Sequence, residues 1–200
     1  MLKKLNQKLI YNPIYMEPID KQEINNTIHK SISDQDLEHY FSPAVEQKVI
    51  VFGDFKKYNS IDELLPNSKD YAIVLIETSK NVGHWCCITK DNNVITWFDS
   101  YGYKYGAELK FVDADKRKLL NEDKNYLANL LKQSKYKIQY NKIHYQNDSP
   151  DVKDCGRYVI LYIILFKEKG FNLKQFQNFM KEQTKRLKLT SDQLVSYLVK

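Results

Sequence analysis

The sequence has little cysteine, glycine or proline. It contains 3 cysteines, 6 glycines and 5 prolines in 200 residues, and two of the cysteines, Cys86 and Cys87, are neighbours. Cysteines in this arrangement do not build a disulfide framework, so a reducing compartment is expected. The low glycine and proline content and the 42% of hydrophobic residues exclude a collagen-like or disordered chain. We expect a single folded domain over residues 1–200.

Long apolar segments are missing as well. The longest apolar run extends from Tyr158 to Phe166, about half of the roughly 20 residues that cross a bilayer. Residues 1–11 lack the apolar core of a signal peptide. The sequence therefore predicts an intracellular protein that is not secreted and has no membrane partner.

Arginine is scarce, because only 3 of the 31 basic residues are Arg, although the formal net charge is +6. A basic charge balance bears on association and solubility rather than on fold. A composition rich in Lys and Asn also follows from an AT-rich coding sequence. The charge by itself does not predict binding to nucleic acid.

Apolar runs and helical periodicity together predict an α+β fold. Strands are expected at residues 48–52, 71–76, 84–89, 94–98 and 137–143. Helices are expected near residues 21–29, from Ser33 to a point before Pro43, and at residues 61–65, 115–134, 155–166, 173–185 and 191–198. Residues 1–30 are expected to form an arm or a short helix. The segment 155–166 is apolar on every side, which predicts a helix buried all round.

Cys155 opens this buried helix, between Asp154 and Gly156. Unpaired backbone N–H groups and the helix dipole stabilise a thiolate at such a position, and the pKa of a thiol falls there from ~8.5 to roughly 3.5–7.5. Gly156 has no side chain, so a peptide carbonyl can approach closely. Cys155 is therefore a possible nucleophile. The alternative is a small core residue, so a partner base is required.

A predicted hairpin supplies the base. If residues 91–92 form the turn centre, His84 faces Asp99 across the two strands, next to the pair of Trp85 and Phe98. Directly opposed residues share a face with Cβ atoms about 5 Å apart, so the imidazole meets the carboxylate. Such a carboxylate orients the histidine and stabilises its imidazolium, as in a catalytic triad. The alternative is an incidental surface ion pair.

Gln146 adds a fourth element, because it lies on the loop before the Cys155 helix. Its side-chain N–H and the backbone N–H of Cys155 are a possible oxyanion hole, a donor pair that stabilises a tetrahedral intermediate. Taken alone, the position of Gln146 favours a solvated loop glutamine, and only the combination with the other three residues favours the oxyanion hole. The order His, Asp, Gln, Cys is that of a papain-type site in permuted order.

The motifs Gly83-His84-Trp85, Phe98-Asp99-Ser100 and Asp154-Cys155-Gly156, with Gln146 before the last, resemble the signature of the adenain and ubiquitin-like-protein protease superfamily. The resemblance covers residues 83–156. It implies a papain-like α+β fold in permuted order, with a central mixed or antiparallel sheet flanked by helices and the nucleophile at the start of a buried helix. It also implies peptide hydrolysis through a thioester, in which His84 is the base, Asp99 orients it, Cys155 is the nucleophile and Gln146 completes the oxyanion hole.

The resemblance also implies cleavage after small residues such as Gly, with Trp85 as one wall of a narrow groove. Residues 31–34 are similar to the Trp-Leu-Asn-Asp element that opens deSUMOylases, although Ser31 stands where that element has Trp. We expect Asp34, Tyr101 and Gly156 to join Trp85 in binding the substrate.

Within the superfamily, the compact lysine-rich chain is most similar to the maturation proteases of adenoviruses, virophages and large DNA viruses. We expect a monomeric endopeptidase that matures viral capsid or core precursors, in the virion and in the host cytoplasm or viral factory. The alternatives are an isopeptidase acting on SUMO or ubiquitin-like modifiers, and a binding module that kept the fold without catalysis.

No cofactor is expected, although DNA or an activating peptide can act as a partner in the viral group. For DNA, residues 116–118, 132–137 and 181–188 are the contact patches to consider, and solvated helix faces are the alternative reading of these lysines.

Other assignments have less support. His144 is closer in sequence to Cys155 than His84 is, but it has no acidic residue in a comparable orienting position. Cys86 shares the strand face of His84 whereas Cys87 points away, which makes these residues a poor metal clamp, and no metal is expected. No phosphate loop or dinucleotide fingerprint is present.

Overall fold

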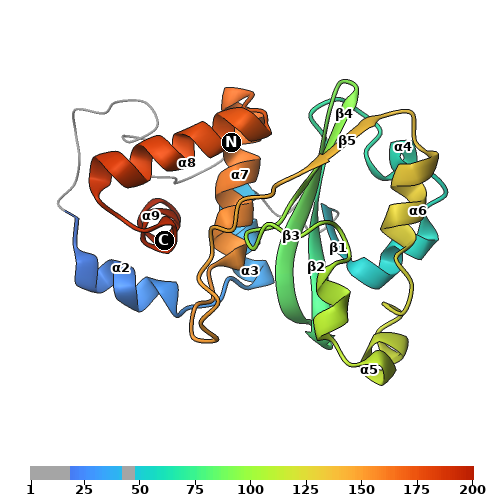
Figure 1. Cartoon of the computed structure of the whole chain (residues 1–200), viewed down its shortest axis with the longest axis horizontal. Coiled ribbons are helices and arrows are strands. Elements are labelled where there is room, and N and C mark those ends of the chain that lie inside the picture. Colours follow the sequence, from blue (N-terminus) through green and yellow to red (C-terminus); the bar gives the residue numbers. More distant parts are fainter. Residues whose placement is uncertain (1–18, 42–47) are drawn as a thin grey trace. The chain divides into compact units, whose positions relative to one another are not determined.

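The computed structural model describes residues 19–41 and 48–200. The chain divides into two compact units. The sheet unit is Gln47–His144, and the helical unit combines Met1–Glu46 with Tyr145–Lys200. Both units appear in Figure 1. The single domain over residues 1–200 stays a prediction.

The sheet unit contains a five-stranded mixed sheet with the strand order β1-β2-β3-β4-β5. The strands are β1 (Val49–Val51), β2 (Tyr71–Ser79), β3 (Val82–Asp91), β4 (Val94–Phe98) and β5 (Lys137–Tyr140). The two outer pairs, β1 with β2 and β4 with β5, are parallel, and the two inner pairs are antiparallel. The predicted α+β class and mixed sheet are thus confirmed.

The register of the β3–β4 hairpin differs from the prediction by two residues. Asp91 pairs with Val94 and Cys87 with Phe98, so the turn centre is Asn92-Asn93 rather than residues 91–92. Asn92 has φ +49°, in the left-handed region of backbone conformations. Asparagine tolerates this region better than most other residues with a side chain. A shift of two residues leaves every side chain on its predicted face, because strand side chains alternate with period two.

One face of the sheet is covered by helices of the same unit. These are the 3-10 helix η2 (Phe52–Lys57) and the α-helices α4 (Ile61–Leu64) and α6 (Tyr126–Gln133). Their apolar side chains pack against inner residues of β2, β3 and β4, with Trp97 and Phe52 among the fully buried ones. The hydroxyl of Ser60 caps α4 by accepting the N–H of Glu63, and the Asn125 side chain caps α6 by accepting the N–H of Ala128.

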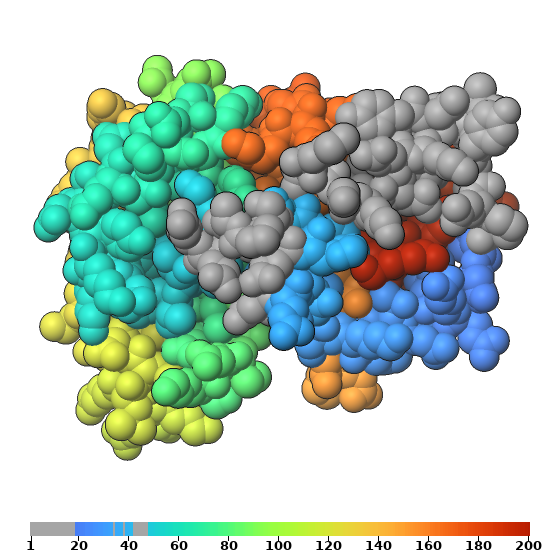
Figure 2. All heavy atoms as spheres, turned by 180° about the vertical axis from the view of Figure 1, so that it is seen from behind, coloured from blue at the N-terminus to red at the C-terminus, as the bar shows by residue number. Residues whose placement is uncertain are grey.

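The helix predicted over residues 115–134 is interrupted. The chain forms α5 (Ala114–Leu119) and α6, and between them Asn121 adopts φ +58°. The break brings residues 120–121 against η2, where a Cβ on Gly53 would lie 2.8 Å from two backbone oxygens of this segment. Lys56 Nζ also donates to Asn121 Oδ1 at 2.8 Å. Figure 2 shows η2 in turquoise beside the yellow-green segment. Tertiary contact therefore overrides the helical periodicity here.

The helical unit contains α2 (Lys21–Ile28), α3 (Asp34–Phe41), α7 (Cys155–Lys169), α8 (Leu173–Leu187) and α9 (Ser191–Leu198). In Figure 1, α9 lies beside α2, α7 and α8, with which it makes contacts. Every residue of α7 from 156 to 166 is buried, so the helix predicted to be buried all round is confirmed. Capping boxes open α8 and α9, and Gly170 ends α7 with φ +67°.

The other helices and strands begin and end within a few residues of the predicted positions. The short helix near residues 21–29 is α2, and the helix starting after Ser33 is α3, whose expected end before Pro43 borders residues outside the described part. Among the described residues, none of the helices has the length and apolar character to span a membrane.

Candidate active site

The first half of the site is a hydrogen-bonded pair of side chains in the sheet unit. His84 lies on β3, and Asp99 follows the last residue of β4. The His84 Nε2 atom lies 2.7 Å from Asp99 Oδ1, and the two side chains are 15% and 0% exposed. The sequence therefore predicted this contact correctly, although the register places the two residues diagonally rather than directly opposite each other.

Asp99 is held by the backbone of the loop that follows β4. Its Oδ1 atom accepts the N–H of Tyr101 at 3.0 Å, and its Oδ2 atom accepts the N–H of Tyr103 at 2.9 Å. Burial by itself raises the pKa of Asp99, but the hydrogen bond and charge of His84, a hydrogen bond from Glu108 and the N–H of Tyr101 outweigh it, so the pKa lies below the ordinary value. At neutral pH Asp99 is a carboxylate that fixes the orientation of the imidazole.

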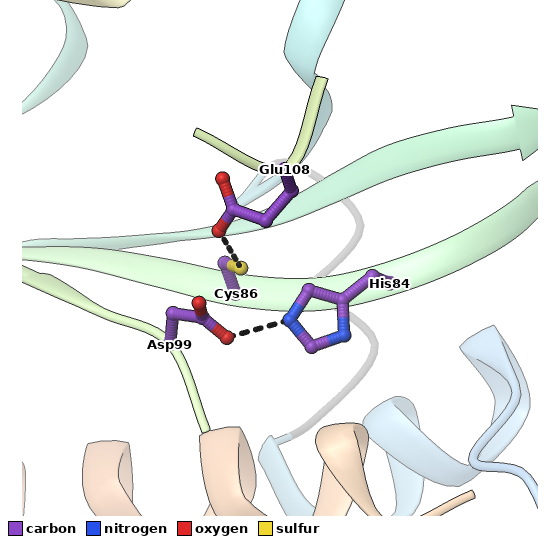
Figure 3. Close-up of side chains that lie close together, drawn as sticks. All are labelled: His84, Cys86, Asp99 and Glu108. Carbon is purple, nitrogen blue, oxygen red and sulfur yellow. Dashed lines mark hydrogen bonds and ion pairs between the residues drawn. The ribbon is translucent and has the colours of Figure 1, made fainter. Parts of the chain in front are cut away.

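This pairing leaves the other ring nitrogen, Nδ1 of His84, pointing away from Asp99 (Figure 3). The ring of Tyr101 lies against the imidazole, with 5.0 Å between centroids and 33° between planes. Tyr101 in turn contacts His144 edge to face at 5.7 Å. Tyr101 thus supports the histidine from both its backbone and its ring, and its predicted role in a substrate groove stays a prediction.

The cluster has two further members, of which the sequence placed Cys86 on the face of His84 but gave no sign of Glu108. Cys86 lies two residues beyond His84 on the same face of β3, and Glu108 opens the 3-10 helix η3 (Glu108–Phe111). Cys86 Sγ lies 3.9 Å from Glu108 Oε1. Burial, followed by the charge of Asp99, raises the pKa of Glu108 to about 8. No local pattern marks Glu108 in the sequence, because only the fold of the loop after β4 brings it to β3.

The second half of the predicted site lies in the helical unit, where Cys155 is the first residue of α7 and is half-buried. The preceding residue, Asp154, is fully buried and accepts from Arg157 at 3.2 Å and from the Ser196 hydroxyl at 3.1 Å. Burial raises the pKa of Asp154 to about 7. Arg157 also donates to the backbone oxygens of Lys30 and Val199. These bonds hold the start of α7, and with it Cys155, in one orientation.

Gly156 is required for a reason other than the predicted access of a peptide carbonyl. A Cβ at this position would lie 2.6 Å from the Cβ of Ile32, closer than real Cβ contacts. Ile32 is itself buried and precedes α3. Gly156 therefore allows the segment before α3 to pack against the first turn of α7. Its role in substrate binding stays a prediction.

Gln146 is not the solvated loop glutamine that its sequence position alone permits. Its side chain is 2% exposed, and its Nε2 atom donates to the backbone oxygen of Val152 at 3.3 Å. The N–H of Asn147 donates to Asp192 on α9, and the hydroxyl of Tyr158 on α7 lies 3.2 Å from the backbone oxygen of Tyr145. The loop before α7 is therefore anchored to two helices of the unit, and the oxyanion-hole role of Gln146 stays a prediction.

The structure thus brings together His84 and Asp99 in one unit and holds Gln146 and Cys155 in the other. The pairing of His84 with Cys155 stays a prediction. Trp85 is 7% exposed on β3, and its role as a groove wall is likewise untested. Asp34 begins α3, but its side chain lies outside the described part. Of the lysine patches, Lys118 forms an exposed ion pair with Asp115 at 3.7 Å.

The observed features define an α+β chain with a buried His–Asp pair at a hairpin end and a cysteine at the first position of a buried helix. No family model matches the chain. It is 30% identical over 152 residues to uncharacterized protein V9 of Sputnik virophage, an alignment that covers 76% of this chain and 85% of V9. The chain belongs to the family of this virophage protein.

Among solved structures, the chain is similar to the SUMO protease Ulp1 with its catalytic cysteine oxidised to a sulfinic acid, at 15% identity and a TM-score of 0.37, covering 96% of this chain and 84% of that one. A de-sumoylating protease also gives 15% identity and a TM-score of 0.37, with 94% and 88% covered. Overlap at this level assigns neither activity nor substrate to the chain.

Proposed function

We propose that this protein is a papain-type cysteine peptidase in which Cys155 is the nucleophile and His84 its general base. The observation that carries the proposal is the buried His84–Asp99 pair, in which Nε2 of the histidine is engaged by a carboxylate. A histidine held in this way has a defined tautomer and a second nitrogen, Nδ1, with which to exchange a proton.

The proposed reaction begins when Nδ1 of His84 takes the thiol proton of Cys155. Backbone N–H groups of the first turn of α7 and the positive end of the helix dipole favour the resulting thiolate. The thiolate attacks the scissile carbonyl, and the imidazolium gives its proton to the leaving amine, which leaves a thioester. Water, deprotonated by His84, then releases the acid and restores the thiol. The proposal requires His84 and Cys155 to meet during this cycle.

The tetrahedral intermediate carries a negative oxygen that needs hydrogen-bond donors. We assign this role to the side-chain amide of Gln146 and the backbone N–H of Cys155. What supports the assignment is the buried, anchored loop that carries Gln146, because a donor that is already ordered costs little reorganisation during the reaction.

We further propose that the substrates are precursor proteins of a virus particle, cut after small residues, in the virion or in the viral factory of an infected cell. Membership in a virophage protein family supports the viral setting. DNA binding, by the patches at residues 116–118, 132–137 and 181–188, stays a prediction. Action on SUMO or ubiquitin-like modifiers is the alternative outcome of the tests below.

The decisive test measures the coupling of His84 to Cys155 without knowledge of the substrate. The alkylation rate of Cys155 by iodoacetamide is followed against pH by mass spectrometry, with the buried Cys86 and Cys87 as internal references. We expect rapid alkylation well below the pH at which an ordinary thiol reacts, and loss of this low-pH reactivity in the His84→Ala variant. An identical profile in both proteins would refute the assignment of His84 as the base.

Activity is then measured as cleavage of a mixture of viral capsid precursors, with and without DNA. Cys155→Ala should abolish cleavage with almost no change in thermal stability, because a small residue replaces a small one. Residual cleavage close to that of the wild type would exclude Cys155 as the nucleophile. Rapid labelling of Cys155 by SUMO or ubiquitin with an electrophilic C-terminus would favour an isopeptidase over a maturation protease.

A further inference from the structure

Four side chains of the sheet unit converge on one buried point. His84 and Cys86 come from β3, Asp99 from the end of β4, and Glu108 from η3 (Figure 3). One ligand-type atom of each lies within 4.8 Å of those of the others. Cys86 and Asp99 are 0% exposed and Glu108 is 6% exposed. Four potential ligands from three elements therefore surround a small volume.

Glu108 is only partly satisfied by the protein. Its Oε2 atom is buried without a hydrogen-bond partner among the described residues, and its Oε1 atom lies 3.9 Å from the thiol sulfur of Cys86. The protonated carboxyl group also forms a hydrogen bond with Asp99. A buried carboxyl oxygen without a partner costs about 1–3 kcal/mol relative to a paired one. Without a cation, Glu108 keeps a proton beside the Asp99 carboxylate, and a cation between the two carboxyl groups would take the place of that proton.

The donor set selects the class of that ligand. One imidazole nitrogen, one thiol sulfur and two carboxylates are the ligands that zinc accepts, whereas magnesium and calcium prefer oxygen alone. In a tetrahedral zinc site the ligand atoms lie about 3.3–3.8 Å apart, so the present spacing of up to 4.8 Å needs a contraction of about 1 Å. The zinc-bound form therefore requires the Glu108 and Cys86 side chains to move by this amount.

We propose that His84, Cys86, Asp99 and Glu108 form a zinc site, and that zinc bound there switches off His84 as a base. The metal takes the lone pair of Nε2, in place of the hydrogen bond to Asp99. The remaining ring hydrogen then resides on Nδ1, which has no lone pair left to accept the proton of a thiol. The thiol proton of Cys86 and the carboxyl proton of Glu108 leave to solvent, and no electrons are transferred.

The binding part of this inference stands on the cluster alone, whereas the inhibitory part rests on the proposed peptidase function. The residues next to His84 in the sequence predict no metal site, because Asp99 and Glu108 join His84 and Cys86 only in the folded chain. The side chain of His84, 15% exposed, is the most accessible of the four and marks the side from which the ion enters.

Zinc binding is measured on the full-length, reduced and metal-stripped protein by competition with a chromogenic zinc chelator. We expect one zinc ion per chain, and an affinity at least about tenfold lower in Glu108→Gln and in Cys86→Ala. The matched control is Cys87→Ala, which removes an equally buried thiol whose side chain points to the other face of β3. Cys155→Ala tests whether the other cysteine provides the sulfur ligand.

Cobalt in place of zinc reports the ligands directly, by a thiolate-to-metal charge-transfer band in the near ultraviolet. The band should be present in the wild type, in Cys87→Ala and in Cys155→Ala, and absent in Cys86→Ala. Absence of stoichiometric binding, or loss of the band in Cys155→Ala, would overturn the proposal. If Cys86→Ala does not fold, as judged by circular dichroism, the wild type, Glu108→Gln and Cys155→Ala still decide the outcome.

The inhibitory part is tested by the ratio of peptidase activity with and without zinc. We expect zinc to reduce the activity of the wild type at least tenfold, and to leave the activity of Glu108→Gln almost unchanged at the same zinc concentration. Equal inhibition of both proteins would refute the switch. If the protein shows no peptidase activity, the binding measurements still test the metal site, so the two proposals fail separately.

Discussion

The replacement Asp99→Asn tests how much the buried pair contributes to stability and to turnover. Asp99 accepts three hydrogen bonds, from Nε2 of His84 at 2.7 Å and from the backbone N–H groups of Tyr101 at 3.0 Å and Tyr103 at 2.9 Å. An asparagine has only one acceptor atom. With its oxygen in the place of Oδ1, the asparagine keeps the hydrogen bonds to His84 and Tyr101. Its NH2 group then takes the place of Oδ2 and faces the N–H of Tyr103, so this hydrogen bond is lost because both groups are donors.

The magnitude follows from these contacts. Loss of one buried hydrogen bond to a charged acceptor costs about 2 kcal/mol, which for a chain of this size lowers the thermal midpoint by about 4–8 °C. The His84 bond persists with a neutral acceptor and loses about half its strength, on the order of 1–1.5 kcal/mol. Turnover should therefore fall about tenfold. Complete loss of the base in His84→Ala should cost roughly 10²–10⁴.

Thermal denaturation and steady-state cleavage assays measure the two effects. The matched control is Asp91→Asn at the other end of the same hairpin, where a partly exposed ion pair with Lys69 contributes at most about 1 kcal/mol. If Asp99→Asn has the stability and turnover of the wild type, the pair does not orient His84. A loss as large as that of His84→Ala would show that the charged carboxylate, and not only one of its hydrogen bonds, is needed to keep the imidazole in its productive tautomer.

Two further replacements test the packing around the site. Glu122 is 0% exposed, and burial raises the pKa of its carboxyl group from 4.5 to about 7. Between these two pH values the folded state holds a proton that the unfolded state releases, so the free energy of unfolding should fall by about 3 kcal/mol as the pH rises from about 4.5 to 7. Glu122→Gln, which can still accept the N–H of Glu77, should flatten this pH profile in denaturant titrations, and an unchanged slope would contradict the prediction. Gly156→Ala should destabilise the helical unit by about 1–3 kcal/mol, because its Cβ would lie 2.6 Å from Ile32, and a thermal midpoint equal to that of the wild type would show that this contact relaxes without cost.

Local patterns in the sequence predicted the helices and strands because their causes are local. The apolar segment after Cys155 is a buried helix whichever partners it meets. The alternation along β3 and β4 puts His84 and Asp99 on one face, even though the cross-strand pairing differs from the prediction by two residues. The site residues His84 and Asp99 could therefore be paired from the sequence, since a hairpin has a short connection and a fixed period.

The tertiary structure decided what depends on segments distant in the chain. The helix expected over residues 115–134 breaks because Gly53 admits a close backbone approach, and Gln146 is buried because its loop is anchored to α7 and α9. Glu108 reaches Cys86 only through the path of the loop after β4, and no periodicity encodes such a path. The sequence by itself thus determined the elements and the pairing of His84 with Asp99. Long-range packing, whose partners no local pattern specifies, determined the position of the buried Glu108 beside this pair.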